Sequence, residues 1–411
     1  MRKVLFLCIS ALIFCNPAFS QNQNLDYYIS TGLKNSPLLK DYANQVQSNI
    51  FDSLKIRASH RPQLNAGAAA MYAPASKNFG YDSAITNGGN YSALLSINQP
   101  LFRRSMMRGQ FDSLGLLNQS IAVNVKITEW ELKKNITSQF ITAYSDLSLF
   151  EFNQSLVRLL NDELGILKSL VERGIYLQSD YLNLSIAIRG TEIAAKQALI
   201  QFKNDLYSLN LLCGIADTAY VTLVKPEFPV PVNPDVMNSP QVLQFKIDSL
   251  KNSNNRILVD LAYKPRLNAF ADAGFNAINP KNITNNFGTS VGLSFAVPIY
   301  DGRQRRFEYG KITLAENTRT NYRDFYHSQF QLKVQQLREQ LKSTDELLSE
   351  ISIQLDEQQK LIDLYKTEIE SGLIRFSDFM LSVTAYANAK NILKQAENNR
   401  LQIINELNYI K

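Results

Sequence analysis

The chain contains the same series of short motifs twice, about 200 residues apart. Asn-Ser-Pro occurs at 35–37 and again at 238–240, and a Glu-x-Gly step occurs at 172–174 and again at 370–372. The spacings between motifs also repeat, with one loop longer in the first copy. Repeats of solenoids and propellers are far shorter, about 20 to 50 residues. The sequence therefore predicts two copies of one large unit, with pseudo-twofold symmetry inside each chain.

The repeat divides the chain into four parts. Residues 1–20 predict a secretory signal peptide, because two basic residues precede a short apolar run that ends in a small-x-small cleavage motif. We expect the first repeat over 21–213, a proline-rich linker over 214–237 and the second repeat over 238–411. A lipid anchor on Cys15 is not expected, since Phe14 stands where a lipoprotein signal needs a small residue.

Several classes of function lack support in the sequence. Lys and Arg, 43 in number against 37 Asp and Glu, are scattered along polar helices without a dense basic block, so nucleic acid is not a predicted partner. No apolar run after residue 20 is long enough for a membrane-spanning helix. The two histidines, His60 and His327, have no partner pattern, and no metal-ligand, phosphate-loop or nucleophile motif occurs. We predict no enzyme, cofactor or metal site.

Each repeat predicts a helix, a β-hairpin, a very long helix and a return helix. A helix of 69 residues is roughly 100 Å long, which exceeds a compact domain. Apolar residues recur along it at steps of three and four and form a narrow seam, so we expect the helices to pack as coiled coils. The hairpins are predicted at 62–102 and 265–299, the long helices at 104–172 and 304–370, and the return helices at 175–213 and 373–411.

The predicted strands alternate between large apolar residues and small or polar ones. This period of two is typical of a strand that faces lipid in a barrel, but also of a half-buried strand in a soluble sheet. Strands of 11 to 13 residues match the ~9–11 needed to cross a bilayer at a tilt. The candidates for lipid-facing residues are Leu95, Ile97, Val291, Leu293 and Phe295.

Four strands per chain are too few for a barrel with a lumen, since even eight leave an interior filled by side chains. Open sheet edges are not tolerated in lipid. If the strands are membranous, several chains must therefore pool them, and three chains would supply twelve strands. The alternative is a soluble periplasmic coiled-coil adaptor or scaffold with small β elements.

These motifs, in this order and repeated, resemble the TolC family of outer-membrane efflux ducts. The matching segments are Asn-Ser-Pro at the helix start, the glycine-containing hairpin end 292–302, and Glu370-Ser371-Gly372 followed by Asp378. The resemblance implies a mixed α/β membrane protein, a homotrimer with a 12-stranded barrel in the outer membrane of a Gram-negative cell and a periplasmic tunnel of long helices. It also implies tripartite efflux or type I secretion, with a periplasmic adaptor (membrane fusion) protein and an inner-membrane transporter as partners. The cargo is not predicted.

Two aspartates are candidates for a periplasmic gate. The resemblance implies that Asp378 lies near the tunnel entrance, where three copies would form an acidic ring. Arg375 accompanies it, and Asp180 is the equivalent acid in the first repeat. The alternative is that both aspartates are N-caps of the return helices, which we favour for Asp180 and weigh equally for Asp378.

Glycines mark the points where each long helix reverses. Gly174 and Gly372 are predicted to make the turns at the tips of the two helical hairpins. The neighbouring loop residues are unusually apolar for a turn, which predicts either adaptor docking or packing within the tip. They are Ile175, Tyr176, Leu373, Ile374, Arg375 and Phe376.

Overall fold

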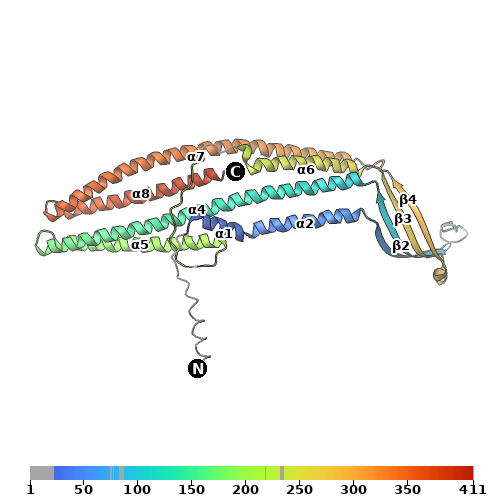
Figure 1. Cartoon of the computed structure of the whole chain (residues 1–411), viewed down its shortest axis with the longest axis horizontal. Coiled ribbons are helices and arrows are strands. Elements are labelled where there is room, and N and C mark those ends of the chain that lie inside the picture. Colours follow the sequence, from blue (N-terminus) through green and yellow to red (C-terminus); the bar gives the residue numbers. More distant parts are fainter. Residues whose placement is uncertain are drawn as a thin grey trace, which may run out of the picture. The chain divides into compact units, whose positions relative to one another are not determined.

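A computed structural model describes residues 23–74, 76, 78–82, 88–217, 219–231 and 236–410, so the predicted signal peptide at 1–20 lies outside the described residues. The order helix, hairpin, long helix and return helix occurs twice (Figure 1). The first series is α1 (Leu25–Asn35), α2 (Pro37–Ser59), β1 (Gln63–Ala73), β2 (Gly88–Leu101), α4 (Arg104–Glu172) and α5 (Gln178–Cys213). The second is α6 (Pro240–Ala262), β3 (Arg266–Ala277), β4 (Phe287–Ala296), α7 (Gln304–Glu370) and α8 (Phe376–Asn408), with short 3₁₀ helices at Val236–Asn238 and Pro280–Asn285.

The four predicted strands are present, and the two long helices occupy the predicted ranges. The return helices were predicted too early. They begin at Gln178 and Phe376 instead of 175 and 373, because the residues after each glycine complete the turn before the helix starts. The sequence analysis also missed α1, an amphipathic helix whose Asn24 side chain accepts a hydrogen bond from the Tyr27 N–H. Among the described residues, no helix has a stretch both long and apolar enough to span a bilayer.

The chain forms two compact units, and each of them draws on both halves of the sequence. The helical unit comprises the described residues of 1–39, 127–236 and 327–411. The sheet unit comprises those of 40–126 and 237–326. The division into two sequence repeats with a linker at 214–237 stays a prediction.

The helical unit is built on the apolar seam of α4. Ile136, Phe140 and Leu147 are buried in one cluster with residues of α1 and α5. Further along, Leu160 and Leu167 are buried in a second cluster with residues of α5, α7 and α8. This confirms the predicted seam, whose buried members supply the hydrophobic free energy that holds the helices side by side.

The missed helix α1 is held against α4 and α5 by close contacts. Tyr28 is fully buried, and its ring centroid lies 5.7 Å from that of Phe140. A Cβ added to Gly32 would lie 2.4 Å from Ile136 Cδ1, so a larger residue there would require the Ile136 side chain to shift. Asn35 Nδ2 donates to the carbonyl oxygen of Cys213 at 3.0 Å, which fixes the end of α1 to the end of α5.

The sheet unit contains one antiparallel sheet in the order β1-β2-β3-β4. One row of its register runs Leu64, Ile97, Ala271 and Val291 across the four strands. On the helical side of this unit, buried Asn254 of α6 donates to the carbonyl oxygen of Gly109 in α4 at 3.1 Å. The helices and the sheet of this unit are therefore formed by residues from both repeats.

Two aspartates meet inside the helical unit, Asp146 of α4 and Asp205 of α5. Burial, together with the hydrogen bond and charge of Asp205, raises the pKa of Asp146 to about 7. Gln139 and Gln201 donate to the Asp205 carboxylate at 3.1 and 2.8 Å. The raised pKa favours the protonated form of Asp146, which can share its proton with Asp205.

Because its folded-state pKa is raised, protonated Asp146 stabilises the fold fully below the usual aspartate range, and this contribution is lost as pH rises through about 7. We expect Asp146→Asn to raise the thermal unfolding midpoint at pH 8 and to have less effect at pH 5. The difference in the free energy of unfolding between wild type and Asp146→Asn should change by up to about 1.4 kcal/mol per pH unit between pH 5 and pH 8. Exposed Asp162→Asn on the same helix is the control, and a pH-independent effect of Asp146→Asn would contradict the prediction.

Candidate functional site: an apolar sheet face and two hairpin tips

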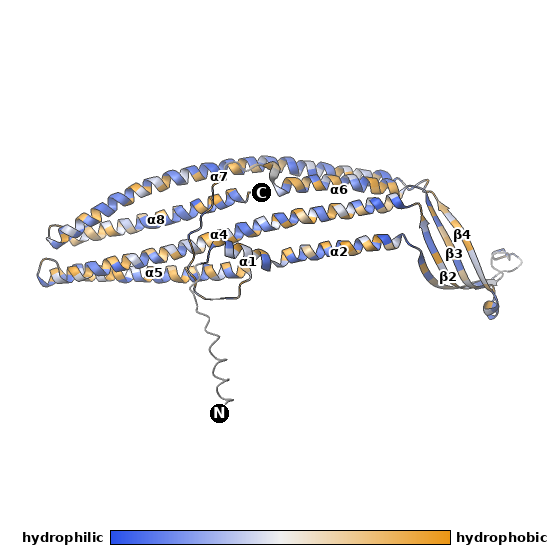
Figure 2. Ribbon diagram, viewed as in Figure 1, coloured by the Kyte–Doolittle hydropathy of each residue, from blue (hydrophilic) through white to orange (hydrophobic). Residues whose placement is uncertain are grey.

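The strand register gathers most of the large apolar residues of the four strands on one face of the sheet. All five predicted candidates belong to it, and in the chain they are exposed: Leu95 by 53%, Ile97 by 44%, Val291 by 83%, Leu293 by 67% and Phe295 by 68%. Figure 2 shows apolar residues along these strands. The register adds further members to this apolar face, namely Leu64, Tyr72, Tyr91, Leu101, Leu267, Phe275 and Phe287.

The opposite face of the sheet carries mainly small and polar residues, with Met71, Leu94 and Phe270 as its large apolar members. Its central row pairs Asn65 of β1 with Ser96 of β2, then Asp272 of β3 with Ser290 of β4. Ser290 Oγ donates to Asp272 Oδ2 at 3.3 Å. This difference between the two faces is typical of a sheet with one face in an apolar environment and the other in water.

The two outer strands of the sheet, β1 and β4, each have one unpaired edge among the described residues. An open edge presents backbone N–H and C=O groups that need partners. Within the described chain the sheet is therefore incomplete on both sides.

In the helical unit, both tip turns have the same backbone hydrogen bonds. Gly174 has φ of 75° and Gly372 has φ of 68°, the left-handed region that favours glycine. The N–H of Ile175 donates to Leu170 O at 3.0 Å, and the N–H of Leu373 donates to Glu368 O at 3.1 Å. These six-residue closures are Schellman motifs, which explains the requirement for glycine.

The candidate aspartates occupy equivalent places but make different contacts. Neither is the N-cap residue that the alternative interpretation expected, since the N-caps are Leu177 and Arg375. Asp180 Oδ2 instead accepts a hydrogen bond from the N–H of Leu177 at 3.1 Å, so it stabilises the start of α5 from the first turn. Asp378 Oδ2 lies 3.4 Å from Nε of Arg375, and the guanidinium is largely exposed. The structure thus pairs the two gate candidates of the second tip.

The apolar tip residues divide into two groups. Phe376 is buried, and Tyr176 and Ile374 pack against the same cluster. Ile175 and Leu373 remain exposed, as does Leu177. Packing within the tip therefore accounts for three of the predicted residues, while an exposed apolar surface remains for the others.

Tyr176 joins the two tips, a role that the sequence analysis did not predict. Its hydroxyl donates to the carbonyl oxygen of Ile374 at 2.9 Å and lies 3.3 Å from that of Ile369. A Cβ added to Gly372 would meet Cγ2 of Ile175 at 2.9 Å. The signal was the difference between the two tip sequences, where Tyr176 in the first corresponds to Ile374 in the second. Nearby, Lys366 Nζ lies 3.3 Å from the buried carboxylate of Glu163 and adds a second link.

Comparison with solved structures identifies the fold. The outer-membrane channel MtrE of Neisseria gonorrhoeae superposes with a TM-score of 0.72 at 12% identity, over 94% of this chain and 88% of that chain. CusC, a protein that forms a transmembrane channel, superposes with a TM-score of 0.74 at 11% identity, over 94% of this chain and 91% of that chain. VceC, an outer membrane protein of Vibrio cholerae, gives 0.71 at 11% identity over 93% and 94%. The chain has the fold of these outer-membrane channels.

This channel fold is the one that the resemblance to the TolC family implied. No family model and no curated protein matches the sequence. The repeat, the strand alternation and the tip motifs therefore carry the signal of this fold, although the sequence identity to the solved channels is low.

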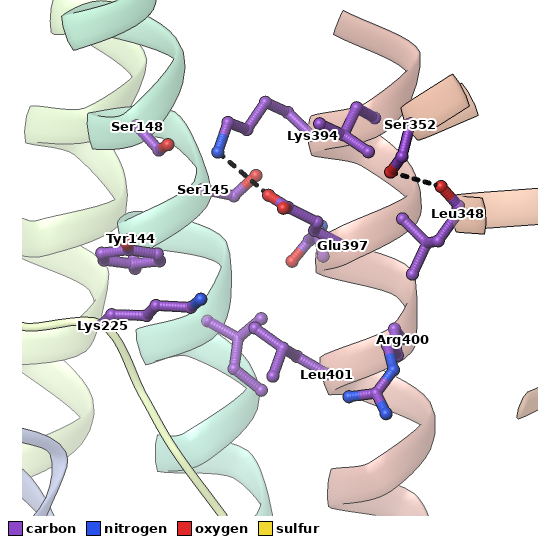
Figure 3. A pocket seen from close by; sticks show the side chains of 13 residues that line it. Tyr144, Ser145, Ser148, Lys225, Leu348, Ser352, Lys394, Glu397, Arg400 and Leu401 are labelled. Atoms are coloured by element: carbon purple, nitrogen blue, oxygen red, sulfur yellow. Dashed lines mark hydrogen bonds and ion pairs between the residues drawn. The ribbon is translucent and has the colours of Figure 1, made fainter. Parts of the chain in front are cut away.

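One cavity of about 350 Å³ lies in the helical unit between α4, α7 and α8 (Figure 3). Lys394 Nζ contacts Glu397 Oε2 at 2.9 Å inside it, and Lys225 also lines it. Among the residues that the structure describes, no group of three or more His, Cys, Asp or Glu side chains could hold a metal ion. The cavity is a charged groove between helices, without the grouping of side chains that metal-dependent chemistry needs.

Alanine at either tip glycine should loosen its turn, because a non-glycine residue in the left-handed region costs roughly 1–2 kcal/mol. We expect Gly372→Ala to cost more than Gly174→Ala, because only the former also meets Ile175. Hydrogen exchange of the Ile175 and Leu373 amides measures both effects, at about fivefold faster exchange per kcal/mol. Adding Ile175→Ala should remove the extra cost of Gly372→Ala. Equal effects of Gly174→Ala and Gly372→Ala in the wild-type background would contradict the contact between residue 372 and Ile175.

Proposed function

We propose that this protein is an outer-membrane duct that conducts cargo passively from the periplasmic side to the exterior. The observation that carries the proposal is the sheet, with one exposed apolar face and two unpaired edges. The fold shared with outer-membrane channels supports it. A duct needs no bond-making chemistry, so the proposed function is not enzymatic.

Three copies complete the sheet in this proposal. Edge strand β4 of one copy pairs with β1 of the next, which closes a 12-stranded barrel and satisfies the open edges in lipid. The apolar face then contacts the acyl chains, and the face with Asn65, Ser96, Asp272 and Ser290 lines the water-filled lumen. The long helices form a tunnel in the periplasm of a Gram-negative cell.

The proposed partners are a periplasmic adaptor (membrane fusion) protein and an inner-membrane transporter. The support is the exposed apolar surface of Ile175, Leu177 and Leu373 at the hairpin tips, which a docking protein would cover. A passive duct takes its selectivity from the transporter that feeds it. Tripartite efflux and type I secretion are both consistent with this arrangement.

The proposal predicts that Val291→Arg blocks assembly in the outer membrane. An arginine that faces lipid at mid-bilayer depth costs about 2–4 kcal/mol per copy. The matched control is Ser290→Arg, one residue away on the opposite face and beside Asp272, where the new cation gains a partner. The readouts are membrane fractionation and heat-sensitive trimer migration on gels. Equal assembly of both variants would refute a lipid-facing Val291, and a soluble wild-type chain would favour the scaffold alternative.

A gate at the second tip predicts a change in ion selectivity. A trimer would bring three Asp378–Arg375 pairs to the tunnel entrance, where acidic side chains attract cations. We expect Asp378→Asn to reduce the preference for K⁺ over Cl⁻ in planar bilayers, and Arg375→Gln to increase it. Asp180→Asn is the control, because that carboxylate is engaged by the Leu177 N–H. Selectivity that responds to Asp180 and not to Asp378 would move the gate to the first tip.

A further inference from the structure

Basic residues are concentrated in four short segments of the sheet unit, 55–61, 103–108, 256–266 and 301–306, which we call the basic collar. The collar holds twelve Lys and Arg and two Asp, with no Glu. The whole chain holds 43 Lys and Arg against 37 Asp and Glu, so acidic residues outnumber basic ones outside the collar. The sequence analysis described these cations as scattered because each segment contributes only three of them.

The sheet topology brings the four segments together. Segments 55–61 and 256–266 lead into β1 and β3, and segments 103–108 and 301–306 follow β2 and β4. In an antiparallel sheet the starts of β1 and β3 lie at the same end as the ends of β2 and β4. The register shows this end directly, with Leu101 beside Leu267 and Arg266 beside Ala296. Figure 1 shows the helices α2, α4, α6 and α7 meeting the sheet at one end of its strands.

The two acids of the collar leave most of its cations without an ion pair among the described residues. Asp260 Oδ1 is bound by Nη2 of Arg305 at 2.6 Å and by the Tyr309 hydroxyl. Asp301 accepts from the backbone N–H groups of Arg303 and Arg305 at 2.9 and 2.7 Å. In the part of the chain that the structure describes, eight of the other collar cations have neither an ion pair nor a cation–π contact, and all of these except the half-buried Arg103 are exposed. These eight are Lys55, Arg61, Arg103, Arg104, Arg108, Lys264, Arg303 and Arg306.

The collar directly adjoins the apolar face. Leu101, Leu267 and Phe295 are the members of that face at this end of the strands, and each lies one to six residues from a collar segment in the chain. An exposed apolar surface that ends in a row of cations matches the chemistry of an anionic lipid, whose acyl chains meet the apolar residues and whose phosphate meets the cations.

We propose that the basic collar binds the headgroups of anionic phospholipids in the membrane leaflet that borders the periplasm. This rests on the proposed function only in requiring that the apolar face lies in lipid. Clusters of four to eight cations beside a membrane segment attract anionic lipid, and each cation strengthens binding by about fivefold. The collar thereby fixes the depth of the sheet in the bilayer and enriches anionic lipid around it.

The test measures binding of dioctanoyl phosphatidylglycerol and dioctanoyl phosphatidylcholine to the detergent-solubilised full chain by native mass spectrometry. The collar variant is R103Q/R303Q/R306Q, and the matched control R158Q/R189Q/K203Q removes three exposed cations from the helical unit. We expect wild type and control to prefer phosphatidylglycerol, and the collar variant to bind it at least tenfold more weakly. R103K/R303K/R306K should restore the preference, and high salt should weaken it. Equal binding of the two lipids by wild type, or no difference between collar variant and control, would overturn the proposal.

Two further experiments distinguish a failure of the collar proposal from a failure of the proposed duct function. Insertion into neutral phosphatidylcholine vesicles tests the membrane role alone, because the collar has no anionic partner there. If all variants insert but phosphatidylglycerol binding is unchanged by the collar variant, the collar assignment is wrong and the duct stands. If wild type enters neither neutral nor phosphatidylglycerol-containing vesicles, the duct itself is wrong. Competition by inorganic phosphate as strong as that by the lipid would assign the collar to free phosphate instead.

Discussion

The hydrogen-bonding groups at the two edges of a four-stranded sheet constrain everything else in this protein. The sheet has one apolar face and one polar face, so its natural place is a boundary between lipid and water. In lipid, an unpaired strand edge costs several kcal/mol for each unsatisfied group. Pairing β4 with β1 of another copy removes both edges together, and it also places the polar face around a lumen. In the proposed trimer, oligomerisation and conduction would follow from the same requirement.

The sequence predicted the parts of the fold that are governed by periodicity. The seam through Ile136, Phe140 and Leu160 located α4, and strict alternation around Leu293 located β4. Local turns were less accessible, because the start of a return helix depends on how many residues the glycine turn consumes. Helix α1 was missed for another reason. Its burial depends on Tyr28 meeting Phe140, a contact more than 100 residues apart in the chain.

The candidate sites show the same division. Glycine turns, the aspartates after them and the apolar strand residues could be predicted because each is encoded by neighbouring residues. The hydrogen bonds of Tyr176 and the basic collar could not, since both depend on segments that only the fold brings together. The cations of the collar in particular are spread over four separate segments of the sequence, and three cations in one segment are typical of an ordinary polar helix end.

The two tips share one backbone turn but differ in their side-chain contacts. Both retain the same glycine turn, so backbone geometry is shared. The first tip uses its acid on its own backbone and reaches across with Tyr176, whereas the second leaves Asp378 to an exposed arginine. A tip whose polar groups are satisfied internally is suited to a structural role. At the second tip, Asp378 and Arg375 pair with each other at the surface. Such an exposed ion pair contributes only about 0–1 kcal/mol, so both residues can exchange partners at low cost. That difference in cost is the physical support for the proposed gate at the second tip.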